Sequence, residues 1–214
     1  MTFIYSYHYG DEFKFTNISM ECNPKNIKKI KFKKVRNAYQ IYMGASWNDR
    51  LEKIRIKTLA FKRQYCDPLR NKFIEDKCKQ LKIGLYSQVA LAQLLSTFPC
   101  VSDSLVDLKS YRFSDNYDNK ITLSNKQEIT INCKSSKFPE WKTNIGKEDI
   151  YCYFHYTQNI QDNEIWELSF LGWLTRTQLQ KLKNQKMGTI DMNTIDNLFS
   201  PESFEKYLEQ LSSK

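Results

Sequence analysis

Ile129-Thr130-Ile131-Asn132-Cys133-Lys134-Ser135-Ser136 is the stretch that decides the fold. Apolar and polar residues alternate along it, which is the period of a β-strand with one buried face. A turn sequence, Ser124-Asn125-Lys126, separates it from a second apolar run at Ile121 to Leu123. Together they predict a β-hairpin that places the side chains of Asn132 and Lys134 on one face of the sheet.

More strands are predicted on both sides of this hairpin. Tyr111-Arg112-Phe113 is a candidate strand upstream, and Asp115 to Asn119 has the composition of a turn. Downstream, Ile150 to Tyr156 is the strongest strand pattern in the chain, and Trp166 to Trp173 predicts the last strand. The tail has helical patterns at 176–183 and 203–211.

Helices are expected before the hairpin. Ser46 to Asp49 resembles a capping box, and Asp67-Pro68 is typical of a helix start. Gly84 is expected to interrupt the second helix, which then continues over 85–96 and ends at Phe98-Pro99. Strands, helices, a mixed sheet and further helices predict an α+β fold, with a central sheet over 111–173 and the 85–96 helix packed on one face.

The first 45 residues are expected to form a β-rich basic appendage, with strands at 3–5, 13–15, 30–33 and 39–42. Residues 46–214 would form the core, the two parts making a single compact unit. The appendage holds a basic ridge in which Lys31 and Lys33 should point outward from a strand. Such a ridge either contacts phosphates or is a solvated edge that discourages aggregation. Its seven members are Lys25, Lys28, Lys29, Lys31, Lys33, Lys34 and Arg36.

Composition narrows the classes of function. The 214 residues carry a formal net charge of +9, which favours polyanionic partners, although AT-rich coding also produces lysine-rich surfaces. No stretch approaches the ~20 apolar residues of a membrane helix, and the start does not resemble a signal peptide. A cytoplasmic or nuclear location is expected. Two histidines, no CxxC pair and no glycine-rich phosphate loop argue against zinc enzymes and nucleotide-loop enzymes.

Four motifs then occur in a meaningful order. They are Gly84-Leu85-Tyr86-Ser87-Gln88-Val89-Ala90, Ile131 to Ser136, Asp149-Ile150-Tyr151 and Gly172-Trp173-Leu174. Here residues 73–180 resemble the PD-(D/E)xK nuclease superfamily, whose core is called restriction-endonuclease-like. Its members carry a helix of type G-x-x-[GS]-E-x-A, a strand of type I-[DE]-x-K-[ST]-[ST], a strand beginning D-x-Y and a strand ending G-[WYF]-[LIV].

The resemblance implies a phosphodiester-cleaving site that binds Mg²⁺ or Mn²⁺. Carboxylates hold such a cation, and a lysine two positions beyond a carboxylate can stabilise charge on the reacting phosphate. Lys134 matches the family lysine. The family aspartate is expected upstream, at Asp118 or, as second choice, Asp115. Asp118 and Asn132 would then be the metal ligands.

Two departures put cleavage in doubt. Asn132 stands at the family's second carboxylate position, and Gln88 stands where the helix has glutamate. Glu75 or Glu128 could supply the missing carboxylate, and Asp149 is a further candidate near the site.

The leading hypothesis is therefore a metal-dependent nuclease, or a nuclease-derived protein, that acts on DNA rather than RNA in defence, restriction or DNA processing. The alternatives are a catalytically inactive nucleic-acid-binding subunit on the same fold, as a homodimer or within a nucleoprotein complex, and a protein-interaction domain. No association with membranes is expected.

Overall fold

The computed structural model describes most of the chain from residue 74 onward and parts of the first 60 residues. The described residues are 16–17, 25, 27–34, 36–43, 49–56, 59–60, 74–106, 118–138, 140–143, 145–158, 165–185 and 192–214. The predicted strands at 3–5, 13–15 and 111–113 and the predicted helix start at Asp67 lie outside them. Among the described residues, no helix is both long and apolar enough to span a membrane.

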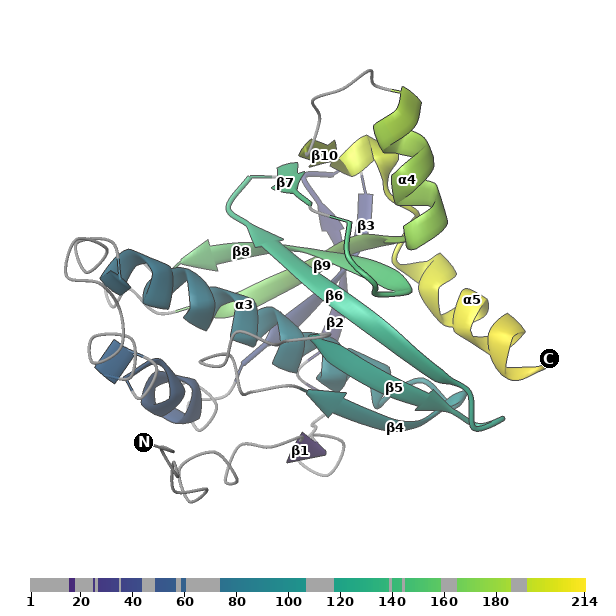
Figure 1. The fold of residues 1–214 in the computed structure, drawn as a ribbon, viewed down its shortest axis with the longest axis horizontal. Coiled ribbons are helices and arrows are strands. Elements are labelled where there is room, and N and C mark those ends of the chain that lie inside the picture. Colours follow the sequence, from purple (N-terminus) through teal and green to yellow (C-terminus); the bar gives the residue numbers. More distant parts are fainter. Residues whose placement is uncertain are drawn as a thin grey trace, which may run out of the picture.

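The molecule is α+β, with a mixed sheet at its centre (Figure 1). The strands are ordered β1-β4-β5-β6-β8-β9-β3-β2. β6 and β8 are parallel, whereas the other neighbours among the described strands are antiparallel. Their bounds are β1 Thr16–Asn17, β2 Ile27–Phe32, β3 Arg36–Tyr42, β4 Val101–Val106, β5 Asn119–Leu123, β6 Glu128–Ser136, β8 Ile150–Gln158 and β9 Ile165–Thr175.

The hairpin predicted from the sequence is β5 and β6, joined by a turn in which Lys126 has a φ of 68°. Burial alternates along β6 as expected, because Ile131 and Cys133 are in the core whereas Asn132 and Lys134 are partly exposed. The prediction of strand structure at 129–134 is confirmed.

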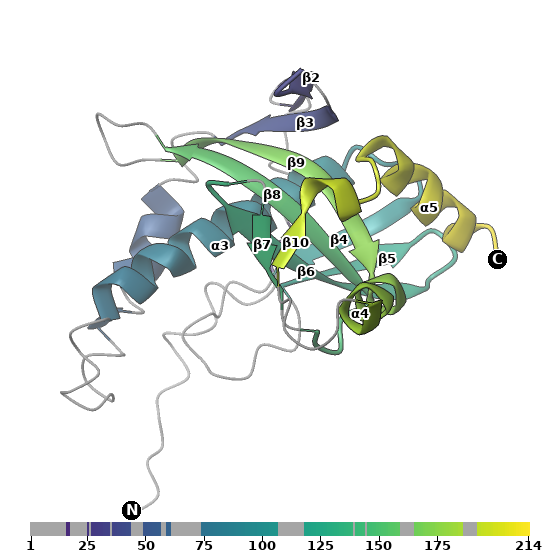
Figure 2. The same cartoon turned by 90° about the horizontal axis from the view of Figure 1, so that it is seen from above.

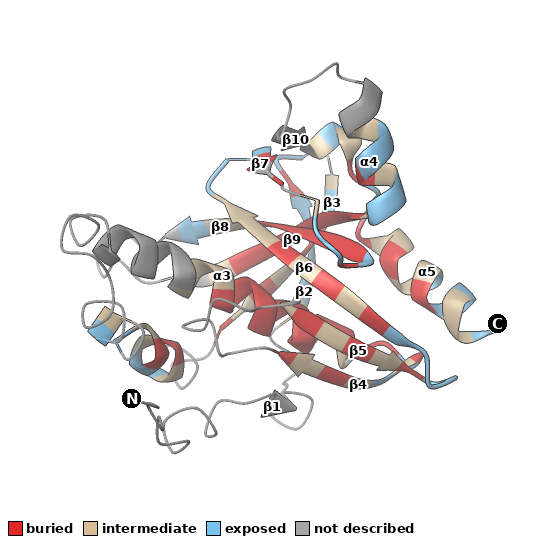
Figure 3. Cartoon of the chain, in the orientation of Figure 1, coloured by how far each residue is buried: buried red, intermediate tan, exposed pale blue. Residues whose placement is uncertain are grey.

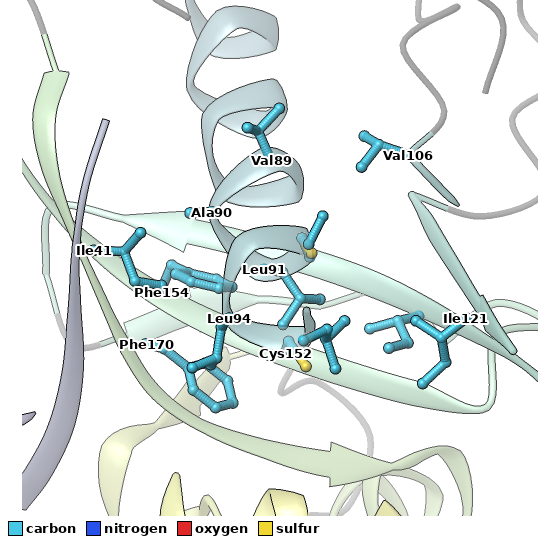
Figure 4. Close-up of a cluster of buried hydrophobic side chains, with 14 of the residues drawn as sticks. Ile41, Val89, Ala90, Leu91, Leu94, Val106, Ile121, Cys152, Phe154 and Phe170 are labelled. Carbon is cyan, nitrogen blue, oxygen red and sulfur yellow. The ribbon is translucent and has the colours of Figure 1, made fainter. Parts of the chain in front are cut away.

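Helix α3 (Ile74–Leu95) lies across one face of this sheet (Figure 1). It runs through Gly84 without interruption, so the predicted break there is wrong. A Cβ at Gly84 would have nothing within 4 Å, and the helix loses only some stability by keeping glycine. Figure 4 shows Val89, Leu91 and Leu94 of α3 above residues of the sheet such as Cys152 and Phe154.

The same face is also covered by α5 (Glu202–Ser212), whose Phe204 and Leu208 join the core under α3. The opposite face buries a second cluster, which includes Trp141, Tyr153 and Leu179. Trp141 lies on β7 (Glu140–Lys142), which pairs with β10 (Met192–Thr194), and Leu179 lies on α4 (Arg176–Gln185). The main sheet is therefore buried on both faces, as the burial colours in Figure 3 show for its central strands.

The N-terminal hairpin belongs to the main sheet. β3 pairs with β9 through Tyr39↔Phe170 and its neighbours, and Figure 2 shows β2 and β3 continuing the sheet beyond β9. The predicted division at residue 45 therefore separates strands of one sheet. β2 also ends at Phe32, so Lys33 lies in the turn and not, as predicted, on the strand.

Arg36 joins this hairpin to the C-terminal segment. Its guanidinium donates hydrogen bonds to the backbone carbonyls of Ile195, Leu198 and Phe199 at 2.5–2.6 Å. Gly172 lies beneath them with a φ of 153°, and a Cβ there would be 2.2 Å from the Phe199 carbonyl oxygen. The glycine of the Gly-Trp-Leu motif thus has a structural reason, because any other residue would collide with the Phe199 carbonyl. We call the hydrogen bonds from Arg36 to the carbonyls of residues 195, 198 and 199 the Arg36 clasp.

Candidate functional site

Asp118 lies at the point where β5 and β6 separate. The ladder between these strands ends at the pair Asn119↔Ile131, so the backbone N–H of Cys133 extends beyond it. The Asp118 side chain takes the place of the missing strand, since its Oδ2 accepts a hydrogen bond from that N–H at 2.7 Å. Its Oδ1 accepts a second bond from Gln88 Nε2 of α3 at 3.0 Å.

Helix α3 is fixed at this point by polar contacts in addition to apolar packing. Asn119 Nδ2 donates to the Gln88 backbone carbonyl at 2.9 Å, and the hydroxyls of Ser135 and Ser87 are 2.7 Å apart. Both amide side chains are buried, with Asn119 fully so. The position of Gln88 relative to β5 and β6 is therefore determined on two sides.

Asn132 extends toward a second carboxylate. Its Nδ2 donates to Glu148 Oε1 at 3.0 Å, and the Tyr151 hydroxyl donates to Glu148 Oε2 at the same distance. Glu148 is buried, with 9% of its surface exposed. Gly146 allows this approach, because a Cβ there would lie 2.2 Å from Glu148 Oε2.

The Tyr151 hydroxyl stays protonated in this setting. The pKa of Tyr151 is raised to about 12, chiefly by burial and further by the charge of Glu148 and the hydrogen bond to it. The hydroxyl also accepts a hydrogen bond from the Gly146 backbone N–H at 2.7 Å, which acts in the opposite direction. Tyr151 is therefore a fixed donor to Glu148.

Lys134 follows on the same strand. The charges of Lys134 and Asp118 both act on the buried thiol of Cys133: burial raises its pKa well above 9.0, the Asp118 charge raises it further, and the Lys134 charge lowers it. No carboxylate within the described part of the chain lies within 4.0 Å of Lys134 Nζ.

Two buried amide oxygens at this site lack hydrogen-bond donors. They are Gln88 Oε1 and Asn132 Oδ1, on the two side chains that direct their NH₂ groups to Asp118 and Glu148. A buried acceptor without a partner costs about 1–3 kcal/mol. Carbonyl and carboxylate oxygens are the ligands that Mg²⁺ and Mn²⁺ prefer, so these residues fit a divalent cation.

The predicted site residues divide into three groups. Asp118 and Gln88 are in direct contact, and Asn132 and Lys134 flank the backbone group that Asp118 binds. Glu128 forms an ion pair with Lys120 at 2.6 Å, and Asp149 binds Thr130. Both line a pocket of about 310 Å³ near the start of β6, where Asp149 binds Thr130, three residues before Cys133. Asp115 and the side chain of Glu75 lie outside the described residues.

Glu148 is the site residue that sequence reasoning missed. It directly precedes the Asp-x-Tyr motif, but only the parallel pairing of Asn132 with Tyr151 brings it beside β6. Among the described residues, no three His, Cys, Asp or Glu side chains are grouped for metal binding.

The ridge residues are also unequal. The six lysines of the ridge are all exposed, and Lys28, Lys29 and Lys33 lie over the rings of Tyr42, Tyr39 and Phe32. Arg36 is used by the Arg36 clasp. The chain matches no family model, and neither a curated protein nor a solved structure is significantly similar to it.

Proposed function

We propose that this protein is a metal-dependent nuclease of the PD-(D/E)xK type, acting on DNA through a weakened cation site. The observation that carries the proposal is Asp118, held in the gap between β5 and β6 by Gln88 and the Cys133 N–H, with Lys134 one residue further. The helix, hairpin and two strands that hold the four motifs, namely α3, β5–β6, β8 and β9, also follow in the order that the resemblance implies.

In this proposal Asp118 and Asn132 hold Mg²⁺ or Mn²⁺, and the Gln88 carbonyl oxygen contributes to the same site. The bound cation would activate water and neutralise charge on the phosphate. Lys134 stabilises the negative charge that develops on the phosphoryl oxygens, which is an effect specific to the transition state. Glu148 orients Asn132 by accepting its amide N–H, so that the carbonyl oxygen remains for the cation.

A non-cleaving nucleic-acid-binding subunit is the second candidate, and one observation favours it. Gln88 and Asn132 each donate to a carboxylate, and this stabilises those carboxylates without a cation. Because these hydrogen bonds already stabilise the charges of Asp118 and Glu148, the folded protein does not require Mg²⁺ to neutralise them.

Restoring the acidic residues tests the proposal. Asn132→Asp and Gln88→Glu each place a carboxylate about 3.0 Å from an existing one, at Glu148 and Asp118 respectively. Like charges at that distance repel, so both variants should unfold at lower temperature without metal and recover with Mg²⁺ or Mn²⁺. Cleavage of DNA should rise together with metal affinity, measured by calorimetric titration.

Gln93→Glu is the control, because Gln93 is also a buried glutamine on the same helix. It should destabilise the protein without rescue by metal. If Asn132→Asp and the double variant with Gln88→Glu fold, bind DNA and still show neither metal binding nor cleavage, the nuclease proposal is wrong and the binding subunit remains.

A further inference from the structure

The carboxyl ends of β6 and β8 meet the β2–β3 turn at His155. Ser136 of β6 pairs with His155 of β8, and the His155 ring is hydrogen-bonded to the backbone of Lys137. From the other side, the Phe32 ring packs edge-on against His155 with 4.9 Å between centroids. His155 therefore links the loop after β6 to the tip of the N-terminal hairpin.

Positive charge gathers on both sides of this histidine. Lys33 and Lys34 form the hairpin turn and Lys137 follows β6, and all three are exposed. Burial lowers the pKa of His155, and the nearby charge of Lys33 lowers it further. Lys33 Nζ lies over the Phe32 ring at 5.7 Å, and the side chains of Lys33, Lys34 and Lys137 are exposed to solvent near this half-buried histidine.

Phe138 adds an aromatic ring to this cationic area. Its side chain is 72% exposed, more than any other large apolar side chain among the described residues. Phe199 is also exposed, but its ring packs on Trp173 at 5.1 Å. The Phe138 backbone is fixed, because its N–H donates to Ser136 Oγ at 3.1 Å.

The Phe138 ring lies near the candidate site. Phe138 is four residues beyond Lys134, which is at most about 14 Å along the chain. Single exposed apolar residues are common and need no explanation. Phe138 instead joins an exposed flat ring on a fixed backbone to the adjacent Lys137 and the nearby Lys134, and proteins that bind unpaired nucleotides combine aromatic rings with positive charge in this way.

We propose that Lys33, Lys34, Lys137 and Phe138 form a binding surface for a single-stranded segment of nucleic acid that continues from the candidate site. We call it the strand-end surface; it rests on the proposed function and names the substrate class. The lysines contact successive phosphates, and the Phe138 ring stacks on an unpaired base. Paired bases already stack on each other, so a duplex could use this ring only after unstacking.

The turn itself supplies a control. Lys33 and Lys34 have φ values of 46° and 61°, and two-residue hairpin turns of this kind favour Asn-Gly. Lys126, in the β5–β6 turn at the other end of β6, has a φ of 68° and is also exposed. A lysine with a positive φ is therefore no sign of nucleic-acid binding by itself. Lys126→Gly relieves the same kind of backbone strain at a position away from the strand-end surface.

The experiment compares binding of one single-stranded DNA oligonucleotide and its duplex by fluorescence anisotropy. The wild type should prefer the single strand. Phe138→Leu, which keeps an apolar side chain but no flat ring, should weaken single-strand binding about 5- to 150-fold and change duplex binding little. Phe138→Trp should preserve the affinity.

The double variant Lys33→Asn with Lys34→Gly should reduce the slope of log K against log salt by up to about 1.4 for the single strand. Its unfolding temperature should rise, because the turn is relaxed. Lys126→Gly should likewise raise the unfolding temperature but leave the single-strand slope unchanged.

The outcomes separate the two proposals. A wild type that binds neither oligonucleotide would overturn the proposed function, and the strand-end surface with it. A wild type that binds DNA, with Phe138→Leu and the lysine double variant unchanged in affinity and slope, would overturn the strand-end surface alone.

Discussion

Gly172 and Gly84 differ in what a methyl group would meet. At Gly172 the added carbon would lie 2.2 Å from a backbone oxygen, on a φ of 153°. Gly172→Ala should therefore destabilise the protein by at least about 1–3 kcal/mol through the backbone alone. Gly84→Ala, in open space within α3, should stabilise it by about 0.5–1 kcal/mol. Urea denaturation of both variants checks the pair, and equal effects would contradict this interpretation.

The Tyr151 hydroxyl reports on Glu148. Glu148→Gln removes the carboxylate charge, so the pKa of Tyr151 should fall from about 12 toward its ordinary 10.0. It should stay above 10.0, because burial is the largest cause of the shift. The phenolate absorbance, taken as the difference from a Tyr151→Phe variant, measures this. An unchanged pKa would mean that Glu148 does not contact the hydroxyl in solution.

Lys134 is predicted to act on the reaction more than on binding. Lys134→Ala should reduce any cleavage by ~10²-fold or more, because the ammonium stabilises charge that is present only in the transition state. DNA affinity should remain within a few-fold of wild type, since Lys134 is one cation among many. Single-turnover rates and anisotropy measured on the same preparation separate the two effects.

At the level of elements, an ion pair joins the helical stretch at 49–56 to α3. Glu52 contacts Lys82 of α3 at 2.7 Å and Arg55 of its own helix. The Arg55 hydrogen bonds, with a further contribution from Lys82, lower the pKa of Glu52 from 4.5 to about 2.

A carboxylate with a lowered pKa stabilises the folded state above the unfolded value and loses that effect as pH falls. The Glu52 contribution should therefore be complete above pH 4.5 and decline toward about pH 2. Lys82→Met should make this decline smaller in denaturation measured across that range, whereas Lys181→Met on α4 should not. The effect is modest, because Glu52 is one-third exposed.

Local elements were predictable where their signal is local. The alternation in β6 and the apolar run of α3 follow from the sequence, because each pattern depends on neighbours within one element. Pairings between distant segments are not encoded in this way. The pairing of β3 with β9 brings Tyr39 beside Phe170. The contact between Glu148 and Asn132 depends on the parallel register of β6 and β8. Sequence patterns therefore predict the N-terminal strands but not their partner β9, and they do not predict the contact between Glu148 and Asn132.

For the whole molecule, the net charge of +9 predicts DNA binding that weakens steeply with salt. Each phosphate neutralised on a duplex should contribute about −0.9 to the slope of log K against log salt. Lys31, exposed on β2, should account for up to about 0.9 of that slope, whereas Arg36 is engaged within the fold. A salt-independent affinity would contradict the basic surface as a nucleic-acid interface.

The Arg36 clasp has a consequence for synthesis of the chain. The carbonyls that Arg36 binds are translated 159 to 163 residues after it. Because chains are synthesised from the N-terminus, Arg36 cannot fix the hairpin that presents Lys33 and Lys34 until residues 195–199 have been translated. A fragment that ends before residue 195 would therefore hold Lys33 and Lys34 on a hairpin that lacks these hydrogen bonds.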